Sequence, residues 1–295
     1  MPTIESLRRS IDSAEDLEAV VSTMKALAAV SINQFEAVVE AIAQYGRTVE
    51  LTLQVLLRNT PAGASAVPEQ MGDGLGAVII GSDQGLCGQF NERLVEHALK
   101  RIGRSGGGTR REILAVGARA AAAIEDEGYA IDDYLPVPAS AGSVIGVVED
   151  IAAAIEDWQE LRGIERVYLY FNRRVETAVH RPTTRRLLPV DADWLEGLAE
   201  REWPSRMLPA FAMDWETLLS RALRQHLLVS IYDAVANSLL SEQASRLQSM
   251  QAAEKNIEER IDELTSLYRQ QRQTAITAEL LDIVSGFEAL AGEAN

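Results

Sequence analysis

The feature that most constrains this chain is a long proline-free stretch at its C-terminal end. No proline follows Pro209, and the only later glycines are Gly286 and Gly292. A helix of roughly 75 residues, with a rise of about 1.5 Å per residue, is about 110 Å long. It cannot bury its apolar face in one compact core, so it needs a partner helix and, beyond that helix, another protein. The apolar residues that recur at helical spacing are Phe211, Trp215, Leu218, Leu227, Ile231, Leu239, Leu247, Ile257, Ile261, Leu264, Tyr268, Ile276, Leu280 and Ile283.

A second long helical pattern occupies the N-terminal end. Residues 3–60 contain no proline and one glycine, Gly46, and their apolar positions also step by three and four. The repeat slips at Ile11–Ala14–Leu17 and at Met24–Ala28–Ile32, and such slips change the local supercoil. We predict that 3–60 and about 209–290 form one long antiparallel coiled coil around a globular insert. The alternative is two separate helical domains, which length alone does not exclude.

Composition limits the classes of function. The chain has 295 residues, of which 47% are hydrophobic but only 5% aromatic, a mixture that suits helices and coiled coils. A net charge of −16 argues against a general nucleic-acid binder, which needs clustered Lys and Arg. The single cysteine, Cys87, excludes an internal disulfide and a multi-cysteine zinc site. No signal peptide or run of about 18 apolar residues occurs, which predicts a cytosolic, soluble chain that meets a membrane only through partners.

Glycine and proline mark the globular insert. Seventeen of the 20 glycines and eight of the nine prolines lie between 61 and 209. This contrast predicts an N-terminal coiled-coil helix at 1–60, a Rossmann-like α/β domain at 61–208 and a C-terminal coiled-coil helix at 209–295. The predicted elements of the insert are strands at 75–82, 112–116 and 166–172, an edge strand at 174–181, helices at 90–102, 118–127 and 143–161, and connections at 61–74 and 104–109. Strands that alternate with helices indicate βαβ units, so the predicted fold class is α/β with a mostly parallel sheet.

The segment 81–88, with the sequence GSDQGLCG, follows the first strand, where a Rossmann-like sheet would hold a ligand. A phosphate-binding loop would need Lys followed by Ser or Thr after the glycines, and none is present. The dinucleotide fingerprint needs three glycines at a fixed spacing, which these glycines do not match. We therefore predict a tight structural turn and no cofactor. Its turn-forming residues are Asp83, Gly85, Cys87 and Gly88.

No catalytic or metal-binding constellation accompanies this turn in the sequence. A nucleophilic Cys87 would need a base to form its thiolate. The three histidines are scattered over different segments and lack metal-ligand spacing: His97, His180 and His226. We predict a packed Cys87, no metal and no catalytic site within this chain.

Three motifs together resemble one family, the gamma subunits of F-type ATP synthases. In the N-terminal helix, Arg8, Ile11 and Ser13 are followed by Met24-Lys25 and Ala28-Ala29. The turn SDQGLCG is similar to the family's S/T-D-x-G-L-C-G. The third motif follows much of the family's S-E-x-x-A/S-R…R-Q-x-x-I-T-x-E-L pattern at Ser241-Glu242-Gln243-Ala244, Arg246, Arg272-Gln273, Ile276-Thr277 and Glu279-Leu280.

The resemblance implies a function for the predicted architecture. In the family, gamma is the central rotor stalk of the F1Fo enzyme, a coiled coil with a Rossmann-like domain at its base. Its partners are a ring of three alpha and three beta subunits, the epsilon subunit and the membrane ring of c subunits. Ion-driven rotation of the stalk changes the conformation of each beta subunit in turn, so the chain itself would need no cofactor. This role implies a peripheral location at the cytoplasmic face of a bacterial plasma membrane.

The resemblance also assigns contact residues. Arg272, Gln273 and Thr277 match family positions that contact loops of the beta subunits, and their hydrogen-bond donors suit acidic and carbonyl partners. Met24 and Lys25 match positions where the stalk meets a beta-subunit loop.

The chain departs from the family at several positions. Asp16–Val21 (DLEAVV) stands where the family has N-T-x-K-I-T, so basic residues are missing. Gln251–Asn256 (QAAEKN) replaces K-A-A-T-D-N. These changes suggest a divergent, Na⁺-linked branch, although the coupling ion, H⁺ or Na⁺, depends on other subunits. Two other functions remain open: a non-rotary coiled-coil scaffold with a ligand-binding α/β domain, and an α/β enzyme with helical extensions.

Overall fold

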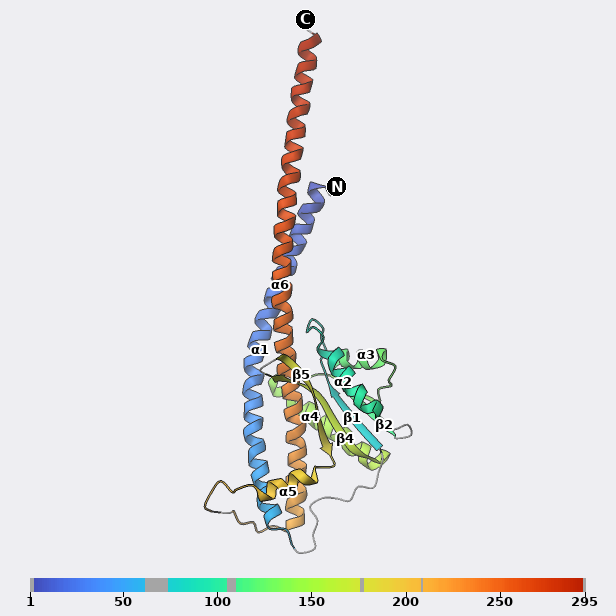
Figure 1. The fold of residues 1–295 in the computed structure, drawn as a ribbon, viewed down its shortest axis with the longest axis vertical. Coiled ribbons are helices and arrows are strands. Elements are labelled where there is room, and N and C mark those ends of the chain that lie inside the picture. Colours follow the sequence, from blue (N-terminus) through green and yellow to red (C-terminus); the bar gives the residue numbers. More distant parts are fainter. Residues whose placement is uncertain (1–2, 62–73, 105–109, 176–177, 208, 294–295) are drawn as a thin grey trace. The chain divides into compact units, whose positions relative to one another are not determined.

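The computed structural model describes residues 3–61, 74–104, 110–175, 178–207 and 209–293. Its two longest helices are α1 (Ile4–Arg58) and α6 (Trp215–Glu293), of 55 and 79 residues (Figure 1). The chain divides into two compact units, Met1–Leu27 with Leu247–Asn295, and Ala28–Arg246. Each unit therefore contains a part of both helices. The predicted connections at 61–74 and 104–109 fall almost entirely outside the described residues.

Side-chain caps explain where the long helices begin and end. Thr3 precedes α1, and its hydroxyl oxygen accepts a hydrogen bond from the backbone N–H of Ser6 (3.2 Å). At the other end, the Asn59 amide donates to the carbonyl of Val55 before Pro61 stops the helix. The predicted start of the C-terminal helix near 209 was about six residues early. The helix begins at Trp215 because the carboxylate of Asp214 accepts from the backbone N–H of Thr217 (3.0 Å).

In the larger unit, α1 and α6 lie side by side and antiparallel. The indole N–H of Trp215 donates to the carbonyl of Leu56 (2.9 Å). Further along, a Cβ placed on Gly46 would lie 3.3 Å from a methyl group of Val229, so glycine permits a close approach of the helices. The buried residues of this interface and its surroundings are Val49, Leu53, Leu56, Leu198, Trp215, Leu219 and Ala222.

In the smaller unit, the same two helices also contact each other. The Lys25 ammonium lies 2.6 Å from both carboxylate oxygens of Glu254. The buried apolar side chains of this unit, among the described residues, are Leu7, Met250 and Leu264. Pairing of α1 with α6 in both units confirms the predicted antiparallel coil and contradicts the alternative of two separate helical domains.

The sheet of the larger unit confirms the Rossmann-like prediction. Its five strands are β1 (Gly74–Ile80), β2 (Arg111–Val116), β3 (Asp133–Leu135), β4 (Ile164–Val175) and β5 (Ala178–Leu188). They lie in the order β3-β2-β1-β4-β5, and only β5 runs antiparallel to its neighbour. The strand predicted at 174–181 was misplaced, since β4 runs on to Val175 and the edge strand begins at Ala178. β3 and the helix α5 (Ala192–Glu200) were not predicted.

Helices cover both faces of this sheet. The helices α2 (Phe90–Arg104) and α3 (Ala118–Asp126) lie on one face, and α4 (Val144–Arg162), preceded by the short η1 (Ala141–Ser143), lies on the other beside α6 (Figure 1). Alternate residues of β1 serve the two cores, because side chains of a strand point to opposite faces. Leu75, Ala77 and Ile79 pack against α2 and α3, whereas Val78 and Ile80 share a core with α4 and α6.

One helix, α1, is long and apolar enough to pass a test for membrane spans. An 18-residue window within it has a mean hydropathy of 1.3, and only 11% of that window is buried. The core helix of a folded domain and a signal sequence near the N-terminus pass the same test. The expectation of a soluble chain therefore stays a prediction.

Candidate functional site at the joint between the sheet and the long helix

The GSDQGLCG segment forms the turn that joins β1 to α2. In a sheet of this order, the strand sequence reverses between β1 and β4, and a crevice for ligands opens at the carboxyl ends of these strands. Residues 82–88, here called the β1–α2 turn, lie at this position. They follow directly on the last residues of β1 and precede Phe90, the first residue of α2.

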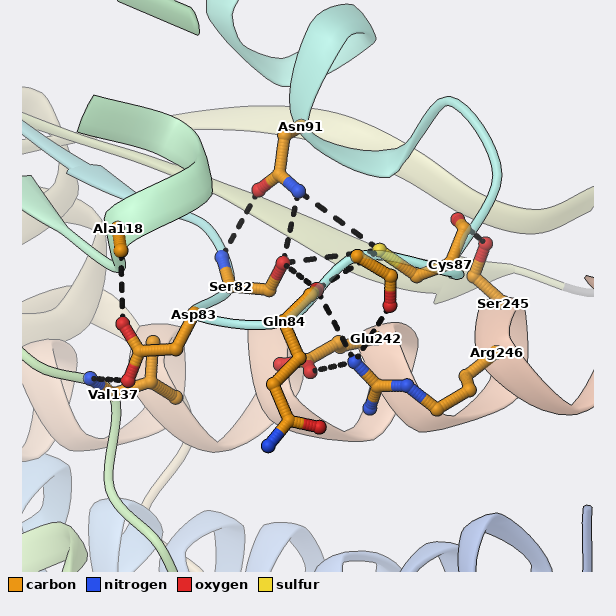
Figure 2. Close-up of polar contacts among 11 residues, drawn as sticks. Ser82, Asp83, Gln84, Cys87, Asn91, Ala118, Val137, Glu242, Ser245 and Arg246 are labelled. Carbon is orange, nitrogen blue, oxygen red and sulfur yellow. Dashed lines mark hydrogen bonds and ion pairs between the residues drawn. The ribbon is translucent and has the colours of Figure 1, made fainter. Parts of the chain in front are cut away.

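Hydrogen bonds fix the turn to the start of α2. The backbone N–H of Ser82 donates to the side-chain oxygen of Asn91 (3.0 Å), and the Asn91 amide donates to the Ser82 hydroxyl (2.8 Å) (Figure 2). That hydroxyl donates in turn to the carbonyl of Gln84 (2.9 Å). Both Ser82 and Asn91 are buried, so these bonds are shielded from water. These bonds therefore tie the turn to the first residues of α2.

Asp83 connects the turn to neighbouring elements. One of its carboxylate oxygens accepts from the backbone N–H of Ala118 (2.8 Å), at the start of α3, where a negative charge is favoured (Figure 2). The other oxygen accepts from the backbone N–H of Val137 (2.9 Å), and the Tyr134 hydroxyl donates to the first (3.3 Å). Asp83 thus hydrogen-bonds to three residues outside the turn.

The long helix supplies the other half of the site. Three of its serine hydroxyls donate to backbone carbonyls: Ser238 to Ile80 (2.7 Å), Ser241 to Asn172 (3.2 Å) and Ser245 to Cys87 (2.7 Å). Ile80 ends β1, Asn172 lies in β4, and Cys87 lies in the turn. We call these three serines, together with Arg246 and the carbonyls they contact, the joint. The joint places α6 at the edge where a Rossmann-like sheet would otherwise present its ligand crevice.

A buried ion pair completes the joint. Arg246 donates to the Glu242 carboxylate one helical turn earlier (2.7 Å), and both side chains are only 7% exposed. The same guanidinium reaches the carbonyls of Gln84 and Gly85 at 3.4 Å (Figure 2). Burial raises the pKa of Glu242, while the positive charge of Arg246 opposes part of that rise. The guanidinium thus links Glu242 of α6 to the carbonyls of the turn.

Cys87 is packed rather than exposed. It is 1% exposed, and desolvation is the main cause that raises the pKa of its thiol. A raised pKa disfavours the thiolate, which is the nucleophilic form. The adjacent Leu86 has a φ of 63°, rare for a residue with a side chain, and that side chain is 62% exposed. The turn therefore buries its cysteine and presents its leucine to the surroundings.

The histidines do not come together. His97 hydrogen-bonds to Thr184 (2.8 Å), His180 packs edge-on against Phe90, and His226 stacks on Trp194. Within the part of the chain that the structure describes, no group of three or more His, Cys, Asp or Glu side chains could hold a metal ion.

The carried-over contact residues lie in the smaller unit, away from the turn in sequence. Arg272, Gln273 and Thr277 are exposed on α6, and Arg272 makes no hydrogen bond or ion pair with the described part of the chain. The Thr277 hydroxyl donates to the carbonyl of Gln273 (2.8 Å). Met24 is half-buried, and Lys25 forms the ion pair with Glu254.

Sequence reasoning missed two members of the joint, Ser238 and Ser245. The available signal was the spacing of three serines by three and four residues, which places them on one face of a helix. Serine at such a spacing is also common on exposed helix surfaces. The pattern alone therefore does not predict that these serines hydrogen-bond to the sheet.

Fold and site together define a class of protein. It is a stalk-type chain, in which paired N- and C-terminal helices carry a Rossmann-like sheet that uses its ligand-binding edge to hold one of those helices. A family model described as ATP synthase matches residues 3–290, which is most of the chain. The chain therefore belongs to the ATP synthase family.

Two relatives of the chain are named ATP synthase gamma chains. The ATP synthase gamma chain of Geotalea uraniireducens is 26% identical over 295 residues, covering 99% of this chain and all of the relative. The gamma chain of Zymomonas mobilis is 25% identical over 302 residues, covering 98% of this chain and all of the relative. Each comparison spans the two long helices as well as the insert.

Solved structures share the fold. A chain of the Euglena gracilis mitochondrial ATP synthase, in a structure of OSCP, F1 and c-ring, matches 98% of this chain and 95% of its own length, with a TM-score of 0.66 and 18% identity. A chain of the rotor structure from the same organism matches 92% and 98%, with a TM-score of 0.63 and 16% identity. A chain in a structure of the Tetrahymena thermophila central stalk and c-ring matches 79% and 99%, with a TM-score of 0.57 and 20% identity.

Proposed function

We propose that this chain is the central rotor stalk, the gamma subunit, of an F-type ATP synthase. The observation that carries the proposal is the unbroken helix α6, which bears the joint at 238–246 and, further along, the exposed residues Arg272, Gln273 and Thr277. A helix that is fixed to the sheet by buried hydrogen bonds, and to the β1–α2 turn by the Arg246 guanidinium, can turn together with the sheet. Family membership and full-length similarity to gamma chains support the same role.

The proposed partners are a ring of three alpha and three beta subunits, the epsilon subunit and the membrane ring of c subunits. The titles of the matching structures name a rotor, F1, a central stalk and a c-ring, each for its own complex. The end of α6 suits enclosure by a partner, because its large apolar side chains are exposed: Leu267, Ile276, Leu280, Leu281, Ile283 and Val284. The largely unburied apolar window of α1 supports the same view.

The proposed mechanism is a coupling of binding energies. The stalk contacts the three beta subunits through different parts of its surface, so its interaction free energy differs among their conformations. Rotation exchanges these contacts and moves each nucleotide site through its states. We place Arg272, Gln273, Thr277, Met24 and Lys25 at contacts with beta-subunit loops. The strained and exposed Leu86 is a further residue suited to contact a partner.

We further propose that the chain has no catalytic site and no cofactor of its own. The joint uses carbonyls of β1, β4 and the turn at the edge where a Rossmann-like sheet would bind a ligand. The coupling ion, H⁺ or Na⁺, is then a property of the membrane subunits. The proposed location is peripheral, at the cytoplasmic face of a bacterial plasma membrane. The division into helices at 1–60 and 209–295 with a domain at 61–208 stays a prediction.

Co-expression with alpha and beta subunits of the same source tests the proposal. Native mass spectrometry is expected to show one copy of this chain per three alpha and three beta subunits, with ATPase activity in the assembly and none in the isolated chain. A stable self-dimer that ignores both subunits would favour the non-rotary scaffold instead. Nucleotide hydrolysis by the purified chain would favour an enzyme.

A further inference from the structure

The ion pair between Lys25 and Glu254 joins the two long helices in the smaller unit. The ammonium lies 2.6 Å from each carboxylate oxygen, so the contact is two-pronged. The two side chains are 33% and 21% exposed, which places the pair at the partly covered edge of the helix–helix seam. In the described residues it is the ion pair that links α1 directly to α6, since the other charged pairs of this unit join residues of one helix.

Most of the apolar seam in the smaller unit is only partly covered. In the described part of the smaller unit only Leu7, Met250 and Leu264 are buried apolar side chains. Ala14, Glu18, Val21 and Lys25 are half-buried at steps of four, three and four residues, so Lys25 lies at a position of the seam. Knobs packed into holes normally oppose sliding of one helix along another. A single polar residue at a seam position, such as Lys25 with its ion pair, specifies the register of a coiled coil.

We propose that Lys25 and Glu254 are positioning residues that fix the register of α1 against α6. A fixed register sets the direction, relative to α1, in which the exposed residues of α6 after Glu254 face. These residues include Arg272 and Gln273. This consequence rests on the proposed rotor function, whereas the register itself does not. Glu254 also neutralises the charge of Lys25 within the chain. A beta-subunit loop that contacts Lys25 therefore meets a neutral ion pair and not a free cation.

Distances between spin labels on the two helices test the proposal in the isolated full-length chain. Labels replace the exposed Asp16 and Glu258 in a Cys87→Ser background, and double electron–electron resonance measures the distribution of distances between them. Lys25→Glu places two carboxylates together and is expected to broaden or shift the distribution. The exchange Lys25→Glu with Glu254→Lys is expected to restore it. High salt is expected to broaden the distribution of the unaltered chain slightly, because a partly covered ion pair is screened less than an exposed one.

The matched control is Lys255→Glu, which changes the charge equally at the next residue of α6. Lys255 lies 3.8 Å from Glu259 of the same helix and does not bridge the seam. Its variant is expected to keep the original distribution. An unchanged distribution in Lys25→Glu, or a failure of the exchange to restore it, would overturn the proposal. If Lys25→Glu does not fold, Lys25→Met removes the charge and keeps the aliphatic stem, and an unchanged distribution there overturns the proposal equally.

The functional consequence is read separately in the assembled complex. The ratio of ions pumped to ATP hydrolysed is expected to fall in Lys25→Glu and to recover in the exchange variant. A normal ratio together with a broadened distance distribution would overturn the link to rotation. The co-expression experiment detects a failure of the rotor proposal independently, because it requires only assembly with alpha and beta subunits.

Discussion

Gly117 shows how closely the β1–α2 turn depends on single backbone positions. It precedes α3 with a φ of 106°, and a Cβ placed there would lie 2.7 Å from the carbonyl oxygen of Ser82. Gly117→Ala is expected to lower the free energy of unfolding by about 3 kcal/mol or more, because strain and a backbone clash combine. Gly128 is the matched control, since its φ is 81° but no atom lies within 4 Å of an added Cβ. Gly128→Ala should cost about 1–2 kcal/mol, and equal losses in urea unfolding would contradict the clash.

His226 gives the chain a predicted sensitivity to acid. Burial and the positive charge of Arg185 lower the pKa of His226 from 6.5 to about 4. Between these values the unfolded chain binds the proton that the folded chain excludes. The contribution of neutral His226 to the free energy of unfolding is therefore fully present above pH 6.5. It is lost as the pH falls toward 4, and the total loss is about 3 kcal/mol.

The variant His226→Phe tests this effect, because it keeps an aromatic ring stacked on Trp194 and removes the titration. Urea unfolding is compared at about pH 7.5, above the window that the two pKa values define, and at about pH 6 and 4.5, within it. The variant is expected to lose less stability on acidification than the unaltered chain. The same slope in both chains would show that His226 does not cause the acid sensitivity.

On the scale of elements, α6 holds the sheet through serines spaced by three and four residues. Ser245→Ala would leave the Cys87 carbonyl buried without its donor, at a cost of about 1–3 kcal/mol. Ser238→Ala should cost a similar amount through the Ile80 carbonyl. Ser266→Ala, on an exposed part of the same helix, is the control and should change stability by less than about 0.5 kcal/mol. Chemical unfolding measures the free energy of unfolding of each variant. Equal losses in all three variants would contradict a stabilising role of the serines in the joint.

Some helices and strands could be predicted from the periodicity of apolar residues, and others could not. Long helices and the buried strands β1, β2 and β4 follow from repeated apolar patterns, and the structure places them within a few residues of the prediction. β3 has three residues and no buried side chain, so its pairing with β2 leaves no sequence pattern. α5 begins at a cap formed by Asp191 within a segment rich in proline, and its nine residues are too few for a clear period.

At the scale of the whole molecule, the contact residues of α6 should affect coupling and leave the fold intact. Arg272→Ala with Gln273→Ala is expected to leave thermal unfolding of the chain unchanged, because both side chains are exposed. In the assembled complex the same variant is expected to reduce ATP synthesis and torque, because partner loops lose charged and amide hydrogen bonds. Arg269→Ala, on the same exposed helix, is the control and should retain coupling. Unchanged coupling in the double variant would remove these residues from the proposed interface.

The sequence by itself determined the architecture and the family. Two long proline-free repeats need each other to bury their apolar faces, and the glycine- and proline-rich middle with alternating strands can only be an insert between them. Tertiary structure decided what sequence could not: that Ser238 and Ser245 bind the sheet, that Lys25 is paired with Glu254, and that Asp83 binds the start of α3. These partners lie from 35 to 229 positions apart along the chain. Periodicity reports which face of an element is buried, whereas only the folded chain shows which polar groups meet on that face.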